Sequence, residues 1–372
     1  MRVLVAPDGF GGSLTAVEAA AAIAAGWRRG APRDEVEEAP LSDGGPGFVD
    51  ALAPLLRARR VDTTVRDPLL RPVGAHLLLE GTTAYVESAD ACGLHLVDAT
   101  MRRPRLQSTA GVGDLLGAAI AAGASTVVIG LGGSGTNDGG AGLLDTCGVG
   151  LRDANGGALP PVPRYLGELD HLELSRNWRP GVALVAATDV DNPLLGPEGA
   201  TTVYGPQKGV PPVEIDFFEA ALRRLAEVVG GQVPGAAGLE QLPGAGAAGG
   251  LGYGLFVLGG RRESGIDLVL NKGRLEERIS SADLVITGEG SFDGQSRRGK
   301  VVAGVARLAR ACGTRCIVLA GRVAPLAGGL DSDGISAAYS VSEAAGSEAA
   351  SLAQPSRQLA ALAEVVSRLD PP

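Results

Sequence analysis

The chain has 372 residues, of which 45% are hydrophobic and 20% charged, and its formal net charge at pH 7 is -9. This length exceeds what one ordinary core needs and predicts two domains. The acidic balance, with basic clusters no longer than arginine pairs, argues against a nucleic-acid partner, because a phosphate backbone would meet no matching charge.

The sequence predicts neither a zinc site nor a disulfide framework. Its four cysteines lack CxxC spacing and its three histidines stand apart, which favours reduced thiols in a cytoplasmic protein. The N-terminal apolar run is too short for a signal peptide and predicts a buried strand. The uncharged residues 115–133 are broken by Gly123 and predict a helix, a turn and a strand, so we expect no membrane contact.

Short β-branched segments alternate with alanine-rich segments along the chain, which predicts an α/β fold with parallel sheets. The first predicted strand, residues 3–6, leads into a loop with Gly9, Gly11 and Gly12. Thr15 and Glu18 have capping-box spacing, so a helix is expected from there to Gly30. Further strands are expected at residues 35–41, 75–79, 83–87, 126–131, 182–187, 282–287 and 315–320. Further helices are expected from Pro46 and at residues 141–147, 301–311 and 355–369.

Asp8 and Asp43 follow the first two predicted strands. The carboxyl ends of parallel strands share one edge of a sheet, and open α/β sheets bind their ligands there. Both carboxylates are therefore candidate substrate-binding groups, although helix capping is a competing interpretation for each.

A glycine-rich turn, GLGGSGTNDGG at residues 130–140, stands between a predicted strand and a predicted helix. Unpaired N–H groups at a helix start, with glycines that let a phosphate approach, favour Gly132, Gly133 and Ser134 as phosphate-binding residues. Asn137 and Asp138 are available to a metal or to a substrate hydroxyl. Many glycine-rich turns are only tight turns, and the chain has 57 glycines. Neither the Walker lysine motif nor the dinucleotide GxGxxG motif fits any strand-turn-helix segment.

A second polar cluster, TDVDNP at residues 188–193, follows another predicted strand. Asp189 and Asp191 suit Mg²⁺ or the proton of a hydroxyl, whereas a turn before proline places the same residue types in about half of such cases.

A third cluster, residues 288–300, contains Glu289, Asp293 and Lys300. Acids that hold a metal and a lysine that neutralises phosphate oxygens are what phosphoryl transfer requires, because its catalysis is mainly positioning and charge stabilisation. Lys300 at the start of a helix has an unfavourable interaction with the helix dipole, which favours an anionic partner over simple solvation.

These motifs together resemble the bacterial glycerate kinases of the type that includes the glycerate 2-kinases. The matching segments are residues 6–8 (APD), 42–45 (SDGG), 132–134 and 136–140 (GGS, TNDGG), 189–194 (DVDNPL), 205–209 (GPQKG), 243–250 (PGAGAAGG) and parts of 288–300. Several long motifs in one order are more specific than any single loop.

The resemblance implies a flavodoxin-like domain built from both chain ends, residues 1–67 and 281–372, with a second α/β domain, residues 68–280, inserted between them. It also implies an ATP- and Mg²⁺-dependent kinase that phosphorylates D-glycerate, at the 2-hydroxyl, to give 2-phosphoglycerate. The expected partners are therefore two small molecules, glycerate and ATP.

Roles for individual residues follow from their chemistry as hypotheses, in a cleft between the two domains. Asp189 or Asp191 receives the hydroxyl proton, and Lys300 neutralises the transferred phosphoryl group. Glycerate is oriented by Asp8, Asp43, Asn137 and Asp138; the nucleotide lies against Gly132, Gly133, Ser134 and Lys208; Glu289 and Asp293 hold Mg²⁺.

Two positions depart from the family pattern. Gly11 stands where these kinases usually have lysine, and Pro46 where they usually have glutamate. Loss of a lysine that binds a carboxylate or phosphate would weaken binding by about 1.5–3 kcal/mol. Two alternatives therefore stay open: a kinase of a different small hydroxy acid, and a ligand-binding relative without catalysis.

Overall fold

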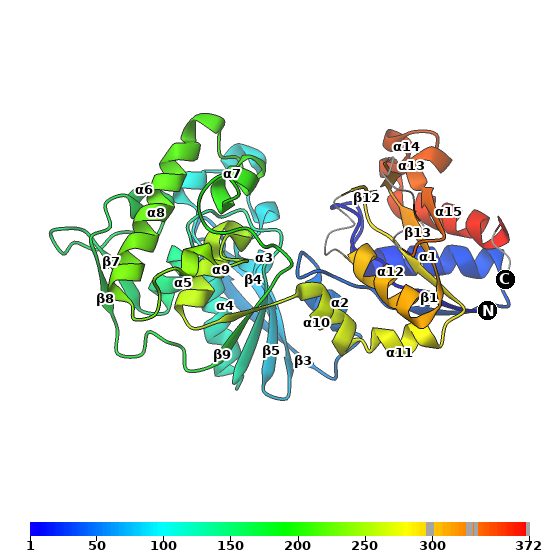
Figure 1. Ribbon diagram of the computed structural model, residues 1–372, viewed down its shortest axis with the longest axis horizontal. Helices are drawn as coiled ribbons and strands as arrows, with labels where there is room; N and C mark the ends of the chain where they lie inside the picture. The colour runs from blue at the N-terminus through cyan, green and yellow to red at the C-terminus, as the bar shows by residue number, and fades with distance from the viewer. Residues whose placement is uncertain (295–300, 325–329, 331–333, 370–372) are drawn as a thin grey trace. The chain divides into compact units, whose positions relative to one another are not determined.

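The computed structural model describes residues 1–294, 301–324, 330 and 334–369. It contains two compact units (Figure 1). Unit 1 comprises Met1–Asp43, Asp50–Leu56 and Gly265–Pro372, and unit 2 comprises Gly44–Val49 and Arg57–Ser264. The expected domain limits, residues 67/68 and 280/281, stay a prediction.

Unit 1 contains a five-stranded parallel sheet with the order β15-β13-β11-β1-β2. Its strands are β1 (Arg2–Val5), β2 (Glu35–Glu38), β11 (Leu284–Thr287), β13 (Arg315–Ala320) and β15 (Ala337–Ser340). The short strands β12 (Ser291–Phe292) and β14 (Arg322–Val323) form a separate parallel pair. The described helices are α1 (Ala16–Gly30), α10 (Gly265–Lys272), α11 (Leu275–Ser280), α12 (Val301–Cys312), α13 (Val341–Ala344), α14 (Glu348–Ala353) and α15 (Pro355–Leu369).

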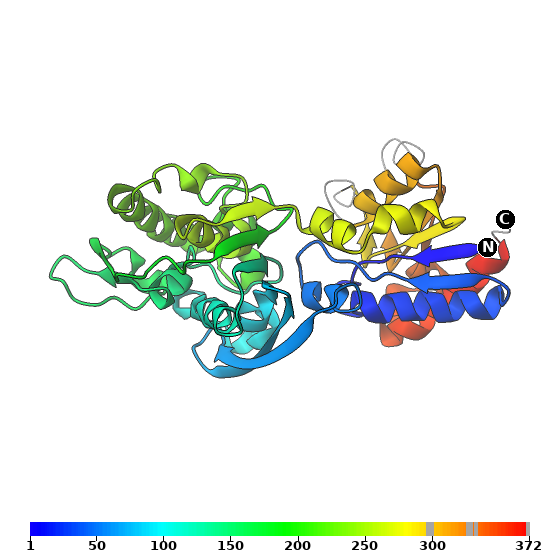
Figure 2. The same ribbon diagram turned by 90° about the horizontal axis from the view of Figure 1, so that it is seen from below.

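Helices cover both faces of this sheet, with α1 and α15 on one side and α10, α11 and α12 on the other (Figure 2). The N-terminus of α1 is fixed by the predicted capping box, in which Thr15 accepts from Glu18 N and Glu18 accepts from Thr15 N. Gly26 lets α1 pack closely on α15, since a β-carbon there would lie 2.0 Å from the Ala360 carbonyl oxygen. Trp27 is fully buried in the core on this side.

Unit 2 contains a six-stranded mixed sheet with the order β10-β9-β6-β5-β4-β3. Its strands are β3 (Arg59–Arg66), β4 (Pro72–Glu80), β5 (Thr83–Glu87), β6 (Thr126–Gly130), β9 (Ala183–Ala187) and β10 (Arg261–Glu263), and β7 (Val149–Arg152) pairs with β8 (His171–Leu174) in a small second sheet. Strands β5, β6, β9 and β10 are parallel, whereas β3, β4 and β5 are joined antiparallel.

The main helices of unit 2 pack around one large apolar core. They are α3 (Ala89–Cys92), α4 (Ala110–Ala121), α5 (Ala141–Thr146), α6 (Pro163–Leu166), α7 (Ala200–Tyr204), α8 (Ile215–Gln232) and α9 (Ala247–Val257); α2 (Phe48–Leu52) begins in this unit. The parallel strands place the loops after β5, β6 and β9 at one edge of the sheet, which is where the predicted polar clusters of this unit lie.

The prediction of an α/β fold with parallel sheets is confirmed. Several predicted boundaries shift by one to three residues, and two of the differences have a local cause. The helix expected from Pro46 begins at Phe48 instead, because Gly47 has a left-handed φ of +89° and cannot continue a helix. The strand expected to reach residue 41 ends at Glu38, although Leu41 N still donates to Pro7 O; Pro40 has no N–H to offer.

In the described ranges, no helix is both long and apolar enough to cross a membrane.

Candidate functional site

Three acid-bearing loops of unit 1 follow neighbouring parallel strands. Asp8 comes after β1, Asp43 after β2 and Glu289 after β11. Backbone hydrogen bonds join these loops, since Asp8 N donates to Gly288 O at 2.8 Å and Leu41 N to Pro7 O at 2.9 Å. The sheet therefore brings the three predicted acidic segments to one edge, as the sequence suggested.

Glu289 and Asp293 were predicted to hold Mg²⁺. Within the described residues no group of three or more His, Cys, Asp or Glu side chains is placed to hold a metal ion. Mg²⁺ is commonly bound by only one or two carboxylates together with substrate phosphates, so two hard oxygen donors still fit it. Glu289 is largely buried, with 6% of its surface exposed, whereas Asp293 follows β12 in a more open position. Lys300 lies outside the described residues.

The glycine-rich turn of unit 2 begins directly after β6 and is held by backbone contacts on both sides. Gly132 N donates to Gly44 O at 3.0 Å, Leu94 N donates to Gly133 O at 2.9 Å, and Gly135 N donates to Cys92 O at 2.7 Å. A β-carbon on Gly132 would lie 2.1 Å from the Gly45 α-carbon. Close packing therefore explains this glycine, independently of any phosphate.

Asp138 is fully buried and satisfied by the protein itself. Its Oδ2 accepts from Thr109 N and Thr109 Oγ1, both at 2.8 Å, and from Gly142 N at 3.1 Å. Its Oδ1 accepts from Gly140 N at 3.1 Å. Burial raises the pKa of Asp138, and these four hydrogen bonds oppose that shift by stabilising the carboxylate. The observed contacts fix the turn to the starts of α4 and α5, and a contact with substrate stays a prediction.

Lys208 is the central charge of this site. Its side chain is 3% exposed, and its Nζ donates to Ser134 Oγ and to Thr136 O, each at 2.8 Å. Among the described residues no carboxylate forms an ion pair with it. Burial lowers the pKa of this amine to about 8, while the nearby Cys92 and Asp138 partly oppose the change. A buried ammonium with two neutral hydrogen-bond acceptors, and with no carboxylate of the described residues at ion-pair distance, is well suited to bind an anion.

Asn137 belongs to the glycine-rich turn and directly follows Thr136, whose carbonyl accepts from Lys208. Its Nδ2 donates to Thr201 Oγ1 at 3.0 Å, and the described chain offers its buried Oδ1 no hydrogen-bond donor. The predicted pair Ser134 and Lys208 is thus brought together directly, with Asn137 three positions after Ser134. Gly249 is required here as well, because a β-carbon on it would lie 2.0 Å from Thr136 O and 2.9 Å from Lys208 Nζ.

Asp189 and Asp191 follow β9, as expected, but their surroundings differ. Asp191 is 76% exposed and its Oδ1 lies 2.7 Å from Arg262 Nη2 in an ion pair. Asp189 is half-buried, and the adjacent Thr188 accepts from Val190 N at 3.2 Å in a local turn. The local turn that the sequence offered as the alternative explanation is therefore present. Proton transfer or Mg²⁺ binding by Asp189 and Asp191 stays a prediction.

Two buried residues of unit 2 were missed in the sequence. Glu87 ends β5 and accepts from Gly47 N at 2.9 Å, and Gln107 precedes α4. A carboxylate at the end of a parallel strand is a signal that the sequence did contain. Gln107 gave no such signal, because glutamine is normally a surface residue and its burial is set by distant segments.

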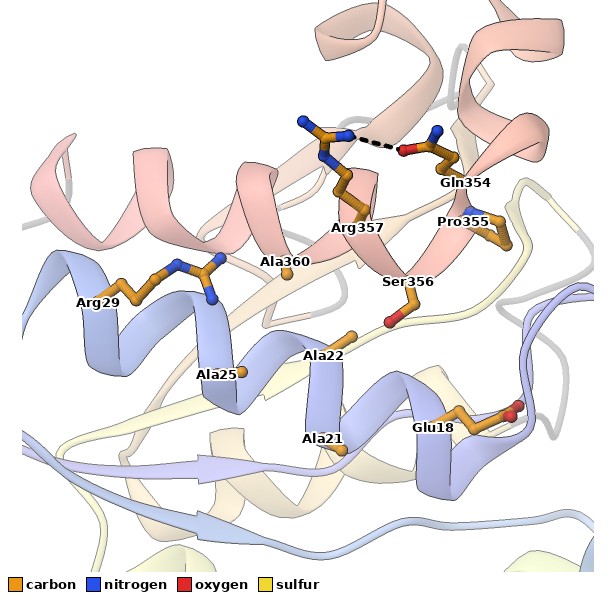
Figure 3. Close-up of a pocket in the computed structure, with 10 residues that line it drawn as sticks. All are labelled: Glu18, Ala21, Ala22, Ala25, Arg29, Gln354, Pro355, Ser356, Arg357 and Ala360. Carbon is orange, nitrogen blue, oxygen red and sulfur yellow. Dashed lines mark hydrogen bonds between the residues drawn. The ribbon is translucent and has the colours of Figure 1, made fainter.

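The groove between α1 and α15 in unit 1 is separate from these residues (Figure 3). It has a volume of about 880 Å³ and is lined by four alanines together with polar and charged residues that include Glu18, Arg29 and Arg357. No residue predicted for the site lines it.

Glycine-rich turns and acids at the carboxyl edges of parallel sheets, together with a buried lysine, are features typical of α/β enzymes that bind small anions. The sequence model of the Glycerate kinase family matches residues 3–370. The chain therefore belongs to the glycerate kinase family, which confirms the resemblance and identifies a kinase.

The chain is similar to several curated proteins over most of their lengths. The chain is 39% identical to a glycerate kinase of Bacillus subtilis and 38% identical to a glycerate 2-kinase of Escherichia coli, in each case over 92% of this chain and 90% of the relative. It is 42% identical to an uncharacterised protein of Mycobacterium bovis, over 99% of this chain and 92% of that protein.

A solved structure is also similar. The crystal structure of a Salmonella typhimurium LT2 protein assigned as glycerate kinase 2 matches with a TM-score of 0.80 and 35% identity, covering 99% of this chain and 98% of that one. The similarity thus extends over the whole fold.

Proposed function

We propose that the protein transfers the γ-phosphoryl group of ATP to D-glycerate, at the 2-hydroxyl, and so forms 2-phosphoglycerate. The observation that carries the proposal is the buried Lys208 ammonium beside Ser134, in a chain that belongs to a kinase family. Such a charge is stabilised when an anionic reactant binds, and phosphoryl transfer depends on charge stabilisation of this kind.

The proposed nucleotide contacts and metal contacts are assigned to separate sets of residues. Lys208, with the turn Gly132, Gly133 and Ser134, binds phosphate oxygens in unit 2, where the Ser134 hydroxyl lies beside the ammonium. Glu289 and Asp293 of unit 1 are the residues that would hold Mg²⁺, which would supply neutralisation of phosphate charge. Lys300 would also neutralise phosphate, and it stays a prediction from the sequence.

The proposed acceptor contacts orient the acid and remove one proton. Asp8, Asp43 and Asn137 orient glycerate, and Asp138 keeps Asn137 in place through its contacts with Thr109. As the hydroxyl oxygen bonds to the γ-phosphorus, the bond from that phosphorus to the bridging oxygen breaks and ADP leaves. The hydroxyl proton passes to a carboxylate. We favour Asp189 for this step, because its side chain is half-buried whereas that of Asp191 is exposed.

A coupled assay tests the proposal. Protein, Mg-ATP and D-glycerate are incubated, ADP release is followed, and enolase alone is then added, since it consumes the 2-phosphate but not the 3-phosphate product. We expect ADP release and an enolase signal. Absence of ADP would refute the kinase proposal for glycerate, and ADP without an enolase signal would move the phosphate to the 3-hydroxyl.

A second candidate is a kinase of a different small hydroxy acid, favoured by Gly11 and Pro46. Gly11 has a left-handed φ of +54°, a conformation that a lysine at this position would adopt only with backbone strain. ADP release measured across a panel of hydroxy acids separates this candidate from the first, and binding without ADP release would favour a non-catalytic relative.

Two further expectations stay proposals. In chain order the strands of the unit 1 sheet run 2-1-3-4-5, which supports a flavodoxin-like domain formed by both chain ends. The four cysteines are free, which supports the proposed cytoplasmic location.

A further inference from the structure

Gln107 of unit 2 is buried in a manner unusual for glutamine. Its side chain is 1% exposed, and the described residues provide no hydrogen-bond partner for either its Oε1 or its Nε2. Leaving one buried polar group unsatisfied costs about 1–3 kcal/mol, and here both ends of one amide are affected. Such a group in a folded protein calls for an explanation, and a ligand that hydrogen-bonds the amide supplies one.

Two fixed contacts connect the segment around Gln107 to the candidate site. Two residues after it, Thr109 donates through N and Oγ1 to Asp138, the neighbour of Asn137. Before it, Arg102 and Pro104 lie against Gly209, the neighbour of Lys208, since a β-carbon on Gly209 would be 3.8 Å from each side chain. The segment that contains Gln107 therefore contacts both the glycine-rich turn with Asn137 and Asp138 and the segment with Lys208 and Gly209.

The unsatisfied atoms indicate which reactant they serve. Gln107 Oε1 and Asn137 Oδ1 are acceptors, so each needs a donor such as a hydroxyl group. Phosphate oxygens only accept at neutral pH, so the phosphate part of a nucleotide cannot satisfy them. A small hydroxy acid offers hydroxyl donors to these oxygens and a carboxylate to Gln107 Nε2.

We propose that Gln107 is a specificity-determining residue for the acceptor, and that its amide, together with Asn137, hydrogen-bonds the hydroxyl and carboxylate groups of a small hydroxy acid. The inference rests on the proposed function, because it assigns the acceptor of that same site. It adds a residue that none of the sequence motifs contains.

Steady-state kinetics of Gln107→Leu test the assignment, because leucine removes the donor and the acceptor while keeping similar bulk. We expect the KM for D-glycerate to rise at least about tenfold, with kcat within about threefold and the KM for ATP unchanged. The preference for D-glycerate over D-lactate, which lacks the 3-hydroxyl, should fall by a similar factor, since a site built to bind a hydroxyl rejects the analogue that lacks it. Gln241→Leu, which removes an exposed amide of the same unit, is the control and should change none of these values.

An unchanged KM for glycerate, or a rise in the KM for ATP instead, would overturn the assignment. A purely structural Gln107 would lower the melting temperature and reduce turnover of all acids in proportion, whereas we expect the variant to melt no lower than the wild type. Gln107→Met, with an unbranched side chain, is the second variant if leucine fails to fold.

Calorimetric titration with D-glycerate, with ADP present, separates failure of this assignment from failure of the proposed function. Binding to the wild type and not to Gln107→Leu supports the acceptor subsite even if no acid is turned over. Equal binding by both proteins overturns the subsite and leaves the kinase proposal standing.

Discussion

Lys208 Nζ donates to Ser134 Oγ at 2.8 Å, so a buried ammonium has a neutral hydroxyl as its side-chain partner. The two residues are 74 positions apart and meet because the turn after β6 packs against the segment that follows α7. Among the described residues no carboxylate forms an ion pair with this amine, and burial lowers its pKa to about 8 although the nearby Asp138 partly opposes the shift. The ammonium of Lys208 therefore loses its proton within the pH range in which activity and stability are readily measured.

The catalytic efficiency should fall at high pH because of Lys208. If the ammonium binds an anionic reactant, kcat/KM reports its protonation in the free enzyme and should decrease above a pKa near 8. A pH profile from 6.5 to 9.5 measures this. Lys208→Met should have a much lower kcat/KM, on the order of tenfold or more, with no such alkaline limb. An identical limb in the variant would assign the ionisation to another group.

Folding stability should show the opposite dependence on pH. The unfolded chain keeps the Lys208 proton up to its ordinary pKa of 10.5, whereas the folded chain releases it near 8. Between these values the unfolded state binds more protons, so raising the pH favours the folded state, by up to about 3 kcal/mol. Below pH 8 the full cost of burying the charge is present.

Subtraction isolates this contribution from the buried thiols, whose raised pKa values act in the other direction. The free energy of unfolding of the wild type minus that of Lys208→Met, from denaturant titrations at pH 7.5 and pH 10, should increase over this interval. A difference that stays constant would show that the folded-state pKa of Lys208 is not depressed.

Gly249 should tolerate no side chain. A β-carbon would lie 2.0 Å from Thr136 O, and the residue has a φ of +69°. We expect Gly249→Ala to lower the free energy of unfolding by about 2–5 kcal/mol, since it adds overpacking to backbone strain, and to impair activity by displacing Thr136 from Lys208. Gly235→Ala is a matched control in the same unit, with a φ of +81° and open space around the added carbon. It should cost about 1–2 kcal/mol, and equal losses in the two variants would refute the packing argument.

Local patterns predicted the parts of the fold that depend on local interactions. The capping box at Thr15, the strand that became β13 and the helix that became α15 lie where the sequence placed them. The polar strand β3 was not predicted, because its alternating exposed residues are ordered by pairing with β4 rather than by apolar periodicity. The proximity of acids at a sheet edge follows from parallel strands and could be predicted.

The polar interior of unit 2 could not be predicted in the same way. The sequence placed Lys208 and Ser134 together at the nucleotide, but nothing around Lys208 shows that it is buried or that its ammonium contacts the Thr136 carbonyl. Gln107 likewise lies in a segment that tertiary contacts hold in place. Thr109 donates to Asp138, and Arg102 and Pro104 lie near Gly209. Contacts of this kind depend on tertiary packing, which residue type and spacing do not encode locally.

The capping box of α1 should contribute about 1 kcal/mol to the stability of unit 1. Thr15→Ala removes the acceptor for Glu18 N and should lower the free energy of unfolding by about 0.5–2 kcal/mol, whereas Thr15→Ser keeps the acceptor and should change little. Guanidinium titrations of the three proteins measure this. If serine and alanine are equally destabilising, the hydrogen bond is not the source of the effect.

Ala248 should be replaceable by glycine without loss of stability, in contrast to other helical alanines. It has φ 53° and ψ 37° at the start of α9, where Gly249 and Gly250 are also left-handed. An L-residue in this conformation costs about 1–2 kcal/mol, and glycine avoids that cost while losing about 0.5–1 kcal/mol of unfolded-state entropy. Ala248→Gly should therefore be neutral or stabilising by about 1 kcal/mol. Ala220→Gly, at an exposed position inside α8, should be destabilising by about 1 kcal/mol. Denaturant titrations of both variants measure the difference in sign, and a loss at position 248 as large as that at position 220 would show that the left-handed conformation of Ala248 stores no strain.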